Sequence, residues 1–380
     1  MKKILTTISA IILLCMVVVS AVYVRYGGGG DFPDLTTKPS LPASALEVVA
    51  NLDLPPGNIA VSDSGRVYFT FHPEAGPNIK VATLINGKAV PYPNEEFQKK
   101  GKGAVYFQSV LSVRIDRQNR LWALDYANHG TGQPRLLAFD LATDKLVHQY
   151  DFPPDVAGIG SHLNDFQVDP EGKTIFIADA SILAKNPAII VYDIINKRSR
   201  RVLENHPSVT AERYVMNVQG QRMVMFGIFA IRPNVDSIAL DRRGEWLYYA
   251  PVTSRHMYRI RAAYLRDGSI GPEKLASMVE TFAPKTMSDG ITTDVDGNIY
   301  ISDADHSAIV CLGQDRKLRT LIKDPILRWP DGFSFGPDGW LYVTCSSLHH
   351  VILKSEKHIK KNAPYQIFRF KPGPAGVPGQ

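Results

Sequence analysis

The chain has 380 residues, is 44% hydrophobic and carries a formal net charge of +6, so it can bury a large core. Its basic residues are scattered except at Lys197–Arg201 and Lys354–Lys361, which argues against a nucleic-acid partner, and its three cysteines do not make a disulfide framework. We interpret Lys354–Lys361 as a solvated loop, with contact to anionic lipid head groups as the alternative.

The N-terminal 25 residues predict export. Two lysines are followed by 21 residues without a charge, Ile4–Val24, and then by Arg25. This pattern is typical of a secretory signal, and cleavage after Ala21 fits it. The run is also long enough to cross a bilayer, which takes about 20 apolar residues. We favour an uncleaved anchor in residues 1–25 that tethers a periplasmic or extracellular domain to the inner membrane. Residues 26–44, which are rich in glycine and proline, are predicted to be a flexible linker.

Residues 45–373 repeat one phrase. Each copy has a short alternating apolar run, a turn rich in Asp and Gly, and a second run of β-forming residues. The six copies are "GNIAVSDSGRVYFT", "LSVRIDRQNRLWALD", "NDFQVDPEGKTIFIAD", "DSIALDRRGEWLYYA", "DGITTDVDGNIYISD" and "DGFSFGPDGWLYVTC". Most of their spacings are near the length of a four-stranded propeller blade, roughly 40–50 residues. The repeats predict an all-β, six-bladed β-propeller, and a β-sandwich ranks well behind because it does not require one phrase six times.

The two ends of the repeated region are expected to meet in the last blade. That blade shows three clear strands, and Ala45–Leu52 can supply its fourth, which removes the sheet edge that an open ring exposes. Residues 374–380 are predicted to be a flexible tail. The link between the third and fourth blades is longer than the others, and its apolar run "RMVMFGIFAI" predicts a partial lid over one end of the propeller.

Polar residues precede the first strand of several blades. In a propeller this strand lines the central tunnel, so these side chains are expected to converge at one tunnel mouth. They are Asn58, Asn164, Asp165, Asp236, Asp289 and Asp331. Carboxylates that lie close together need a cation or protons to offset their repulsion. Oxygen ligands suit a hard divalent ion, Ca²⁺ first, with Mg²⁺, Mn²⁺ or Zn²⁺ as alternatives. The competing interpretation is that these residues only form turns.

Histidines are predicted to gather on the same face. Seven of the ten fall in loops at this end of their blades: His72, His129, His162, His256, His306, His349 and His350. A histidine near a cation can act as a general acid or base. His162 is the strongest candidate because it lies two residues from Asn164. The alternative is that they are exposed loop residues.

Four segments together resemble the yellow / major royal jelly protein family in its bacterial branch, over roughly residues 45–370. They are "SHLNDFQVDPEGKTIFIADA", "AIIVYDIINKRSRRVLENHPSV", "SIALDRRGEWLYYAPVTSRHMYRI" and "SDGITTDVDGNIYISDADHSAIV". The family is a six-bladed propeller that is related in fold to the gluconolactonase / senescence marker protein (regucalcin-like) group. That relation implies a divalent metal held by a Glu, two Asn and an Asp, which activates lactone hydrolysis. Asn164 matches one Asn ligand, Asp289 matches the Asp ligand and base, and Asp236 stands at the second Asn position. The Glu is missing, because its position falls on Gly57 or Asn58.

Two classes of function follow for this exported propeller. In the first, a metal at Asn164, Asp236 and Asp289 polarises a small lactone, while Asp289 or His162 activates water. The substrate contacts predicted around them are Asn58, Asp165, Asp331, His306, His256 and His129. In the second, the mouth binds a small amine or aromatic ligand without chemistry, or isomerises a dopachrome-type substrate, as the yellow resemblance implies. We rank the hydrolase first and expect a monomer that meets the membrane only through its N-terminal segment.

Overall fold

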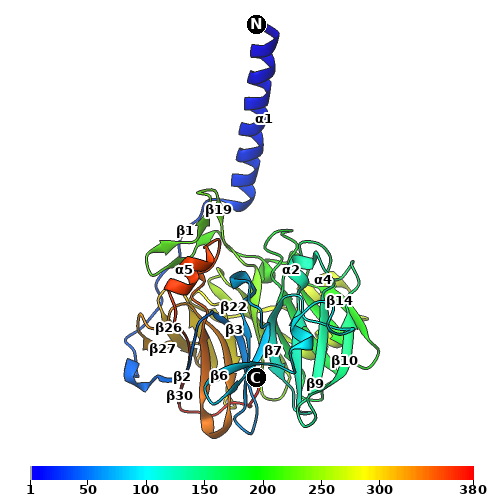
Figure 1. Cartoon of the computed structure of the whole chain (residues 1–380), viewed down its shortest axis with the longest axis vertical. Helices are drawn as coiled ribbons and strands as arrows, with labels where there is room; N and C mark the ends of the chain where they lie inside the picture. The colour runs from blue at the N-terminus through cyan, green and yellow to red at the C-terminus, as the bar shows by residue number, and fades with distance from the viewer. Residues whose placement is uncertain (1) are drawn as a thin grey trace.

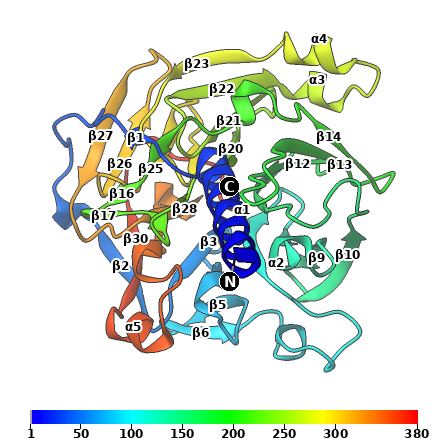
Figure 2. The same ribbon diagram turned by 90° about the horizontal axis from the view of Figure 1, so that it is seen from above.

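The computed structural model describes residues 2–380 and is a six-bladed β-propeller, as the repeats predict (Figure 1). Six sheets of four strands each surround one axis, which Figure 2 views end-on. The strands of the first three blades are β3 (Pro56–Val61), β4 (Val67–Phe71), β5 (Val81–Ile85), β6 (Lys88–Pro91); β7 (Val110–Ile115), β8 (Arg120–Asp125), β9 (Arg135–Asp140), β10 (Lys145–Asp151); and β11 (Leu163–Val168), β12 (Thr174–Asp179), β13 (Ala188–Asp193), β14 (Arg198–Val202). Those of the last three are β20 (Val235–Leu240), β21 (Trp246–Pro251), β22 (His256–Arg261), β23 (Glu280–Pro284); β24 (Ile291–Thr293), β25 (Ile299–Asp303), β26 (Ala308–Leu312), β27 (Leu318–Lys323); and β28 (Pro330–Phe335), β29 (Leu341–Cys345), β30 (Tyr365–Phe370), β2 (Glu47–Leu52).

The inner strand of each blade lies nearest the axis. The six inner strands are β3, β7, β11, β20, β24 and β28. Every residue of β3, β7 and β20 is buried, because each strand pairs with its own sheet along one edge and contacts the inner strands of both neighbouring blades. The apolar core therefore lies between blades, as in the cluster that joins Trp122, Ile177 and Tyr192. This packing fixes the inner strands and makes them a rigid support for the residues at their ends.

The last blade is completed by a strand from the start of the domain. β2 pairs antiparallel with β30, with Val48 opposite Phe368 and Leu52 opposite Tyr365. The pairing agrees with the arrangement expected from the sequence, except that the strand begins at Glu47 rather than Ala45. The outer edge of the last blade is thus occupied by the first strand of the domain in sequence.

The C-terminal residues lie across the end of the propeller that is opposite α1 (Figure 1). The carbonyl of Ala375 accepts from the amide of Val295, that of Gly379 from Ile115, and that of Gln380 from Phe335. These bonds reach three different blades. The tail that the sequence predicts to be flexible is therefore bound, because its backbone completes hydrogen bonds at the ends of inner strands.

The N-terminal helix α1 (Lys2–Tyr26) stands on the other end of the propeller and rises over the axis (Figures 1 and 2). Its residues 3–26 are long and apolar enough to cross a membrane, which fits a secretory signal as well as an anchor. The chain that follows is not a free linker. β1 (Gly30–Asp31) pairs with β15 (Tyr214–Val215), and the amide of Leu41 donates to the carbonyl of Leu321.

The long link between the third and fourth blades folds over the same end of the propeller. It forms β15 and two short hairpins, β16 (Asn217–Val218) with β17 (Gln221–Arg222) and β18 (Val224–Met225) with β19 (Phe229–Ala230). The remaining short α-helices are α2 (Ala127–Gly130), α3 (Ala262–Arg266), α4 (Pro272–Ala276) and α5 (Glu356–Lys361).

Candidate functional site

A cavity of about 270 Å³ lies at the tunnel mouth, and its lining includes Leu183 and Phe229, which contact Tyr26 at the end of α1. Its polar residues are Asn58, Asn164, Asp165, Asp236, Asp289 and Asp331, joined by Glu74 and by His72, His129 and His162. Its apolar lining is Leu111, Tyr126, Ile182, Leu183, Met225, Phe229, Ile231, Pro233, Trp329, Leu348, Ile352 and Leu353, together with Gly57. Met225, Phe229 and Ile231 come from the long link, which therefore covers the mouth as the lid prediction expected.

A repeated backbone irregularity aims the acidic residues at the axis. The register of the inner strand shifts near its mouth end in five blades, between Pro56 and Ile59, Val110 and Ser112, Leu163 and Phe166, Val235 and Ser237, and Pro330 and Phe333. A bulge of this kind leaves residues out of the ladder and turns their side chains. Asn58, Asp165, Asp236 and Asp331 lie inside these shifts, whereas Asp289 precedes the short strand β24.

The glycines beside Asp289 and Asp331 allow neighbouring blades to approach closely. A Cβ on Gly290 would lie 2.2 Å from the carbonyl oxygen of Asp331, and one on Gly332 would lie 2.9 Å from the Cα of Asn58. The amide of Gly290 donates to Ser302 Oγ at 2.7 Å. The Asp-Gly pairs at the start of the fifth and sixth blades are therefore contacts around the axis and not hairpin turns.

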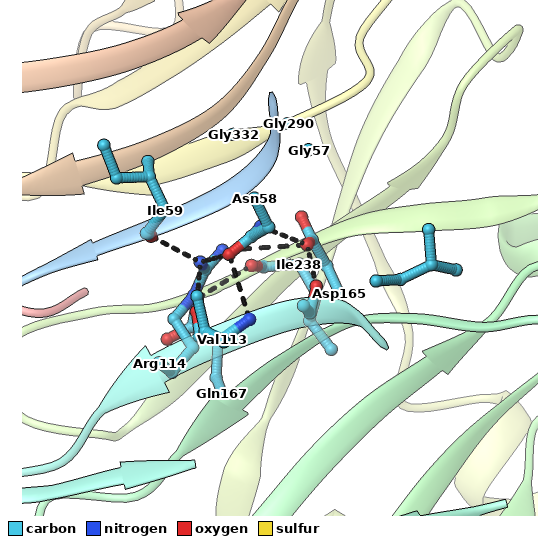
Figure 3. A network of polar contacts seen from close by, with 12 residues as sticks. Gly57, Asn58, Ile59, Val113, Arg114, Asp165, Gln167, Ile238, Gly290 and Gly332 are labelled. Atoms are coloured by element: carbon cyan, nitrogen blue, oxygen red, sulfur yellow. Dashed lines mark hydrogen bonds and ion pairs between the residues drawn. The ribbon is translucent and has the colours of Figure 1, made fainter. Parts of the chain in front are cut away.

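A buried arginine lies beside two of the cavity residues, Asn58 and Asp165 (Figure 3). Arg114 on β7 is 1% exposed, and its guanidinium donates to Asn58 Oδ1 at 2.5 Å and to the carbonyl of Val113 at 3.0 Å. It also lies 3.8 Å from Asp165 Oδ1, which accepts from Asn58 Nδ2 at 2.8 Å and from Ser112 Oγ at 2.7 Å. Asn58 and Asp165 are thus held in a closed polar network around a fixed positive charge.

Three other carboxylates of the cavity, those of Asp236, Asp289 and Asp331, have no such partner. Among residues 2–380, no Lys, Arg or His lies within ion-pair distance of Asp236, Asp289 or Asp331. Asp289 Oδ2 accepts from Trp329 Nε1 at 2.5 Å. Burial raises the pKa of Asp289 to about 6. Burial, followed by the charge of Asp289, raises the pKa values of Asp236 and Asp331 well above the ordinary range. These three carboxyl groups have no ion-pair partner, and protons that they share offset their mutual repulsion instead.

Three neutral histidines and a tyrosine form one wall. The ring of His162 stacks on Tyr126 at 5.0 Å between centroids and meets His129 edge-on at 4.7 Å. Burial lowers the pKa of His72 to about 4 and that of His162 well below its usual value. The buried Nδ1 atoms of His129 and His162 have no hydrogen-bond partner within residues 2–380. They can therefore bond a ligand in the cavity.

Two predicted substrate contacts lie elsewhere. His306 is held by Asp303, with Nδ1 2.9 Å from a carboxylate oxygen, and although burial opposes it, this contact raises the pKa of His306. His256 lies beside Glu212, with 4.0 Å between Nδ1 and Oε1. Neither residue lines the cavity, because local carboxylates hold both in their own loops. The predicted ring of histidines is thus corrected to His72, His129 and His162.

The predicted divalent metal does not fit this arrangement. The part of the chain that is described, residues 2–380, holds no group of three or more His, Cys, Asp and Glu side chains placed to hold a metal ion. Asn164, Asp236 and Asp289 do line one cavity, but Trp329 takes one oxygen of Asp289. Asn58, at the position of the missing Glu, gives its oxygen to Arg114. Calcium takes six to eight oxygen ligands, which this set does not supply.

Sequence comparison identifies relatives in insects. The profile described as "Major royal jelly protein" matches residues 108–352. Major royal jelly protein 7 of Apis mellifera is 24% identical over 242 residues, 60% of this chain and 52% of the relative. Major royal jelly protein 6 of the same species is 26% identical over 249 residues, again 60% of this chain and 52% of the relative. The chain therefore spans about half the length of the curated relatives it matches.

Structure comparison identifies the same architecture in other proteins. A luciferin-regenerating enzyme superimposes with a TM-score of 0.56 at 13% identity, over 88% of this chain and 97% of the other. A calcium-binding protein, regucalcin, from Agrobacterium tumefaciens gives 0.54 at 13% identity, over 90% and 98%. A gluconolactonase from Xanthomonas campestris gives 0.52 at 13% identity, over 90% and 96%. At these identities the likeness shows the fold alone.

Proposed function

We propose that this chain, which belongs to the major royal jelly protein family, binds a small organic cation in the tunnel-mouth cavity. The observation that carries the proposal is the set of Asp236, Asp289 and Asp331, which share one cavity and have no basic partner in residues 2–380. A buried cluster of carboxylates binds a cation to offset its own repulsion. Arg114 is within ion-pair distance of Asp165 and acts on Asp331 only from farther away, so the three carboxyl groups keep acceptor oxygens for a ligand.

The shape and lining of the cavity favour an amine over a metal ion. An ammonium group donates to a few acceptors at hydrogen-bond distance, whereas a divalent ion needs a nearly complete shell of oxygens. Tyr126, Phe229 and Trp329 supply aromatic faces, which attract organic cations. The volume of about 270 Å³ is slightly below the usual range for small-molecule sites, about 300–1,000 Å³, so it suits a small head group.

The direct test is calorimetric titration of the full chain in detergent with phenethylamine and with its neutral analogue phenethyl alcohol. The amine should bind and the alcohol should not. Asp289→Asn should weaken amine binding about tenfold or more, because it removes a buried counter-charge. Asp296→Asn is the matched control, since Asp296 is an exposed carboxylate in the hairpin turn of the same blade. Equal binding of amine and alcohol would contradict the proposal.

Hydrolysis of small lactones is the second candidate. It is favoured by Asp289, whose raised pKa of about 6 suits a general base near neutral pH. His162, which lines the same cavity, stays neutral because burial lowers its pKa, and it can orient water or substrate. If the full chain hydrolyses a lactone in a Ca²⁺-dependent manner and binds no amine, the hydrolase stands and amine binding falls.

A further inference from the structure

We infer that α1 holds the cavity mouth against a lipid bilayer, so that the end of the propeller carrying the site is a membrane-docking surface. Figure 1 shows α1 standing on this end, and Figure 2 shows it above the propeller axis. None of the apolar segment of α1 is buried by the rest of the chain, so its side chains have no protein cover. The partner that suits such a helix is lipid.

The helix has little length to spare. Its 25 residues extend about 37 Å at 1.5 Å per residue, compared with a hydrocarbon core about 30 Å thick. Its last residue is fastened directly to the rim of the cavity. Tyr26 Oη donates to the carbonyl of Leu183 at 2.8 Å, and the ring of Tyr26 stacks on Phe229 at 4.6 Å. Leu183 and Phe229 both line the cavity, so the mouth lies within a few ångströms of the end of the helix.

The foot of the helix is fixed by further hydrogen bonds. The guanidinium of Arg232 donates to the carbonyls of Tyr26 at 2.8 Å and Gly27 at 2.7 Å, and Arg25 donates to the carbonyl of Ala184 at 3.0 Å. These bonds, together with the pairing of β1 and β15, leave no flexible spacer between membrane and propeller. The propeller therefore cannot turn its mouth away from the bilayer while the foot stays bound.

The rim has the composition of a surface that meets a membrane interface. Phe226, in the turn of the hairpin that touches α1, is 85% exposed, and Ile159 in a loop beside α2 is 84% exposed. Basic groups surround the foot, among them the exposed Arg25 and Arg213 and the half-buried Lys185. Burial, with the neighbouring Arg232 and Arg25, lowers the pKa of Lys185 to about 8. Apolar side chains flanked by basic groups suit the boundary of an anionic bilayer.

This placement defines the class of ligand, a step that rests on the proposed function. The outer part of the cavity is apolar, through residues such as Met225, Ile352 and Leu353, and the inner part is acidic. A molecule that enters from lipid would place a cationic head among Asp236, Asp289 and Asp331 and leave an apolar tail toward the bilayer. The ligand expected here is a membrane-partitioning amine.

The docking surface is tested by measuring how deeply labelled side chains enter the bilayer. The full chain is placed in vesicles of phosphatidylcholine and phosphatidylglycerol. Single cysteines carrying nitroxides replace Phe226 and Ile159 in a Cys15→Ala background. The remaining thiols are shielded, because Cys345 is buried and burial raises the pKa of Cys311 to about 11. Ile195→Cys is the matched control, since Ile195 is 69% exposed but lies in the β13–β14 turn at the opposite end.

Collision with oxygen relative to a water-soluble nickel chelate should be about tenfold higher at positions 226 and 159 than at position 195. Equal, water-like ratios at all three positions would overturn the docking surface. A ten-residue Gly/Ser insertion between Val24 and Arg25 keeps the apolar segment and leaves the contacts of Arg25, Tyr26 and Gly27 on the propeller. It therefore separates the membrane segment from the foot and should lower the ratio at position 226 toward that at position 195. An unchanged ratio in this variant would show that the foot of α1 does not hold the mouth in place.

The ligand class is tested with the same protein in lipid nanodiscs. Dodecylamine should bind at least about tenfold more tightly than butylamine, and dodecanol should not compete. If butylamine binds as tightly as dodecylamine, the amphiphile class is overturned and the proposed function survives. If neither amine binds, the proposed function falls, and the depth measurement still judges the docking surface on its own.

Discussion

Asp289 lies in a largely buried acidic group, in which Asp236 is buried and Asp289 and Asp331 are half-buried, and which is destabilising unless a cation or protons are bound. Burial raises its pKa from 3.8 to about 6. A carboxyl whose pKa is higher in the folded chain binds its proton more tightly there. Its contribution to the free energy of unfolding is therefore complete below about pH 4 and is lost as the pH rises through about 6. The protonation of Asp289, taken alone, should therefore make the ligand-free protein less stable at pH 7 than at pH 4.

Asp289→Asn should remove that loss. Without ligand, the variant should gain about 1–2 kcal/mol in unfolding free energy over the natural chain at pH 7, after allowance for partial exposure, and should show no gain at pH 4. Urea unfolding at both pH values, with Asp296→Asn as control, measures the difference. A gain of equal size at both pH values would mean that charge is not the cause. Saturating amine should reverse the sign at pH 7, because only the natural chain then has its full set of counter-charges.

The residues of the site were only partly predictable from sequence. The polar and acidic residues at the tunnel mouth were predictable, because each of them stands at the start of the first strand of its repeat. Arg114 was missed, although a charged residue inside the buried strand "LSVRID" is itself unusual. His256 and His306 were placed at the mouth by position in the repeat alone. Sequence pattern does not reveal that Glu212 and Asp303 hold them elsewhere, because those contacts depend on loop conformation.

At the scale of elements, strand β2 decides whether the ring is closed. A register shift between Val48 and Ala50 gives these two residues different surroundings: Ala50 is 4% exposed and Val48 is 51% exposed. Ala50→Asp puts a carboxylate into the core between blades and should cost about 3 kcal/mol or more, with aggregation through the released edge of β30. Val48→Asp, in the same strand, should change stability by less than about 0.5 kcal/mol.

Thermal unfolding and light scattering of the two variants test this. Equal losses for Ala50→Asp and Val48→Asp would show that β2 does not lie in this register.

The strand itself was predictable from the missing fourth strand of the last blade. The bulges were not, because a bulge changes hydrogen-bond register without changing the alternation of residue types.

At the scale of the whole molecule, the two ends of the propeller have different roles. The mouth end carries α1, the lid hairpins and the cavity, whereas the opposite end is crossed by residues 374–380 (Figure 1). Both terminal segments are rich in Gly and Pro and were therefore predicted to be flexible. Each is bound because its backbone pairs with groups that the blades leave free, a tertiary effect that composition does not contain.

The tail is expected to contribute stability without contributing to binding. Four backbone hydrogen bonds join it to Ile115, Val295 and Phe335, which belong to or follow inner strands of three blades. Removing residues 374–380 should therefore lower the unfolding free energy by about 2–6 kcal/mol, at roughly 0.5–1.5 kcal/mol for each of the four bonds. Amine affinity should not change, because the tail and the acidic residues lie at opposite ends of the inner strands. The buried Arg114 network also separates the cavity from the middle of the tunnel. Chemical unfolding and calorimetric titration of the truncated chain measure the two quantities separately. A loss of affinity together with stability would mean that the ends of the propeller are coupled through the inner strands, and that the acidic site depends on the closure of the ring as well as on its own blades.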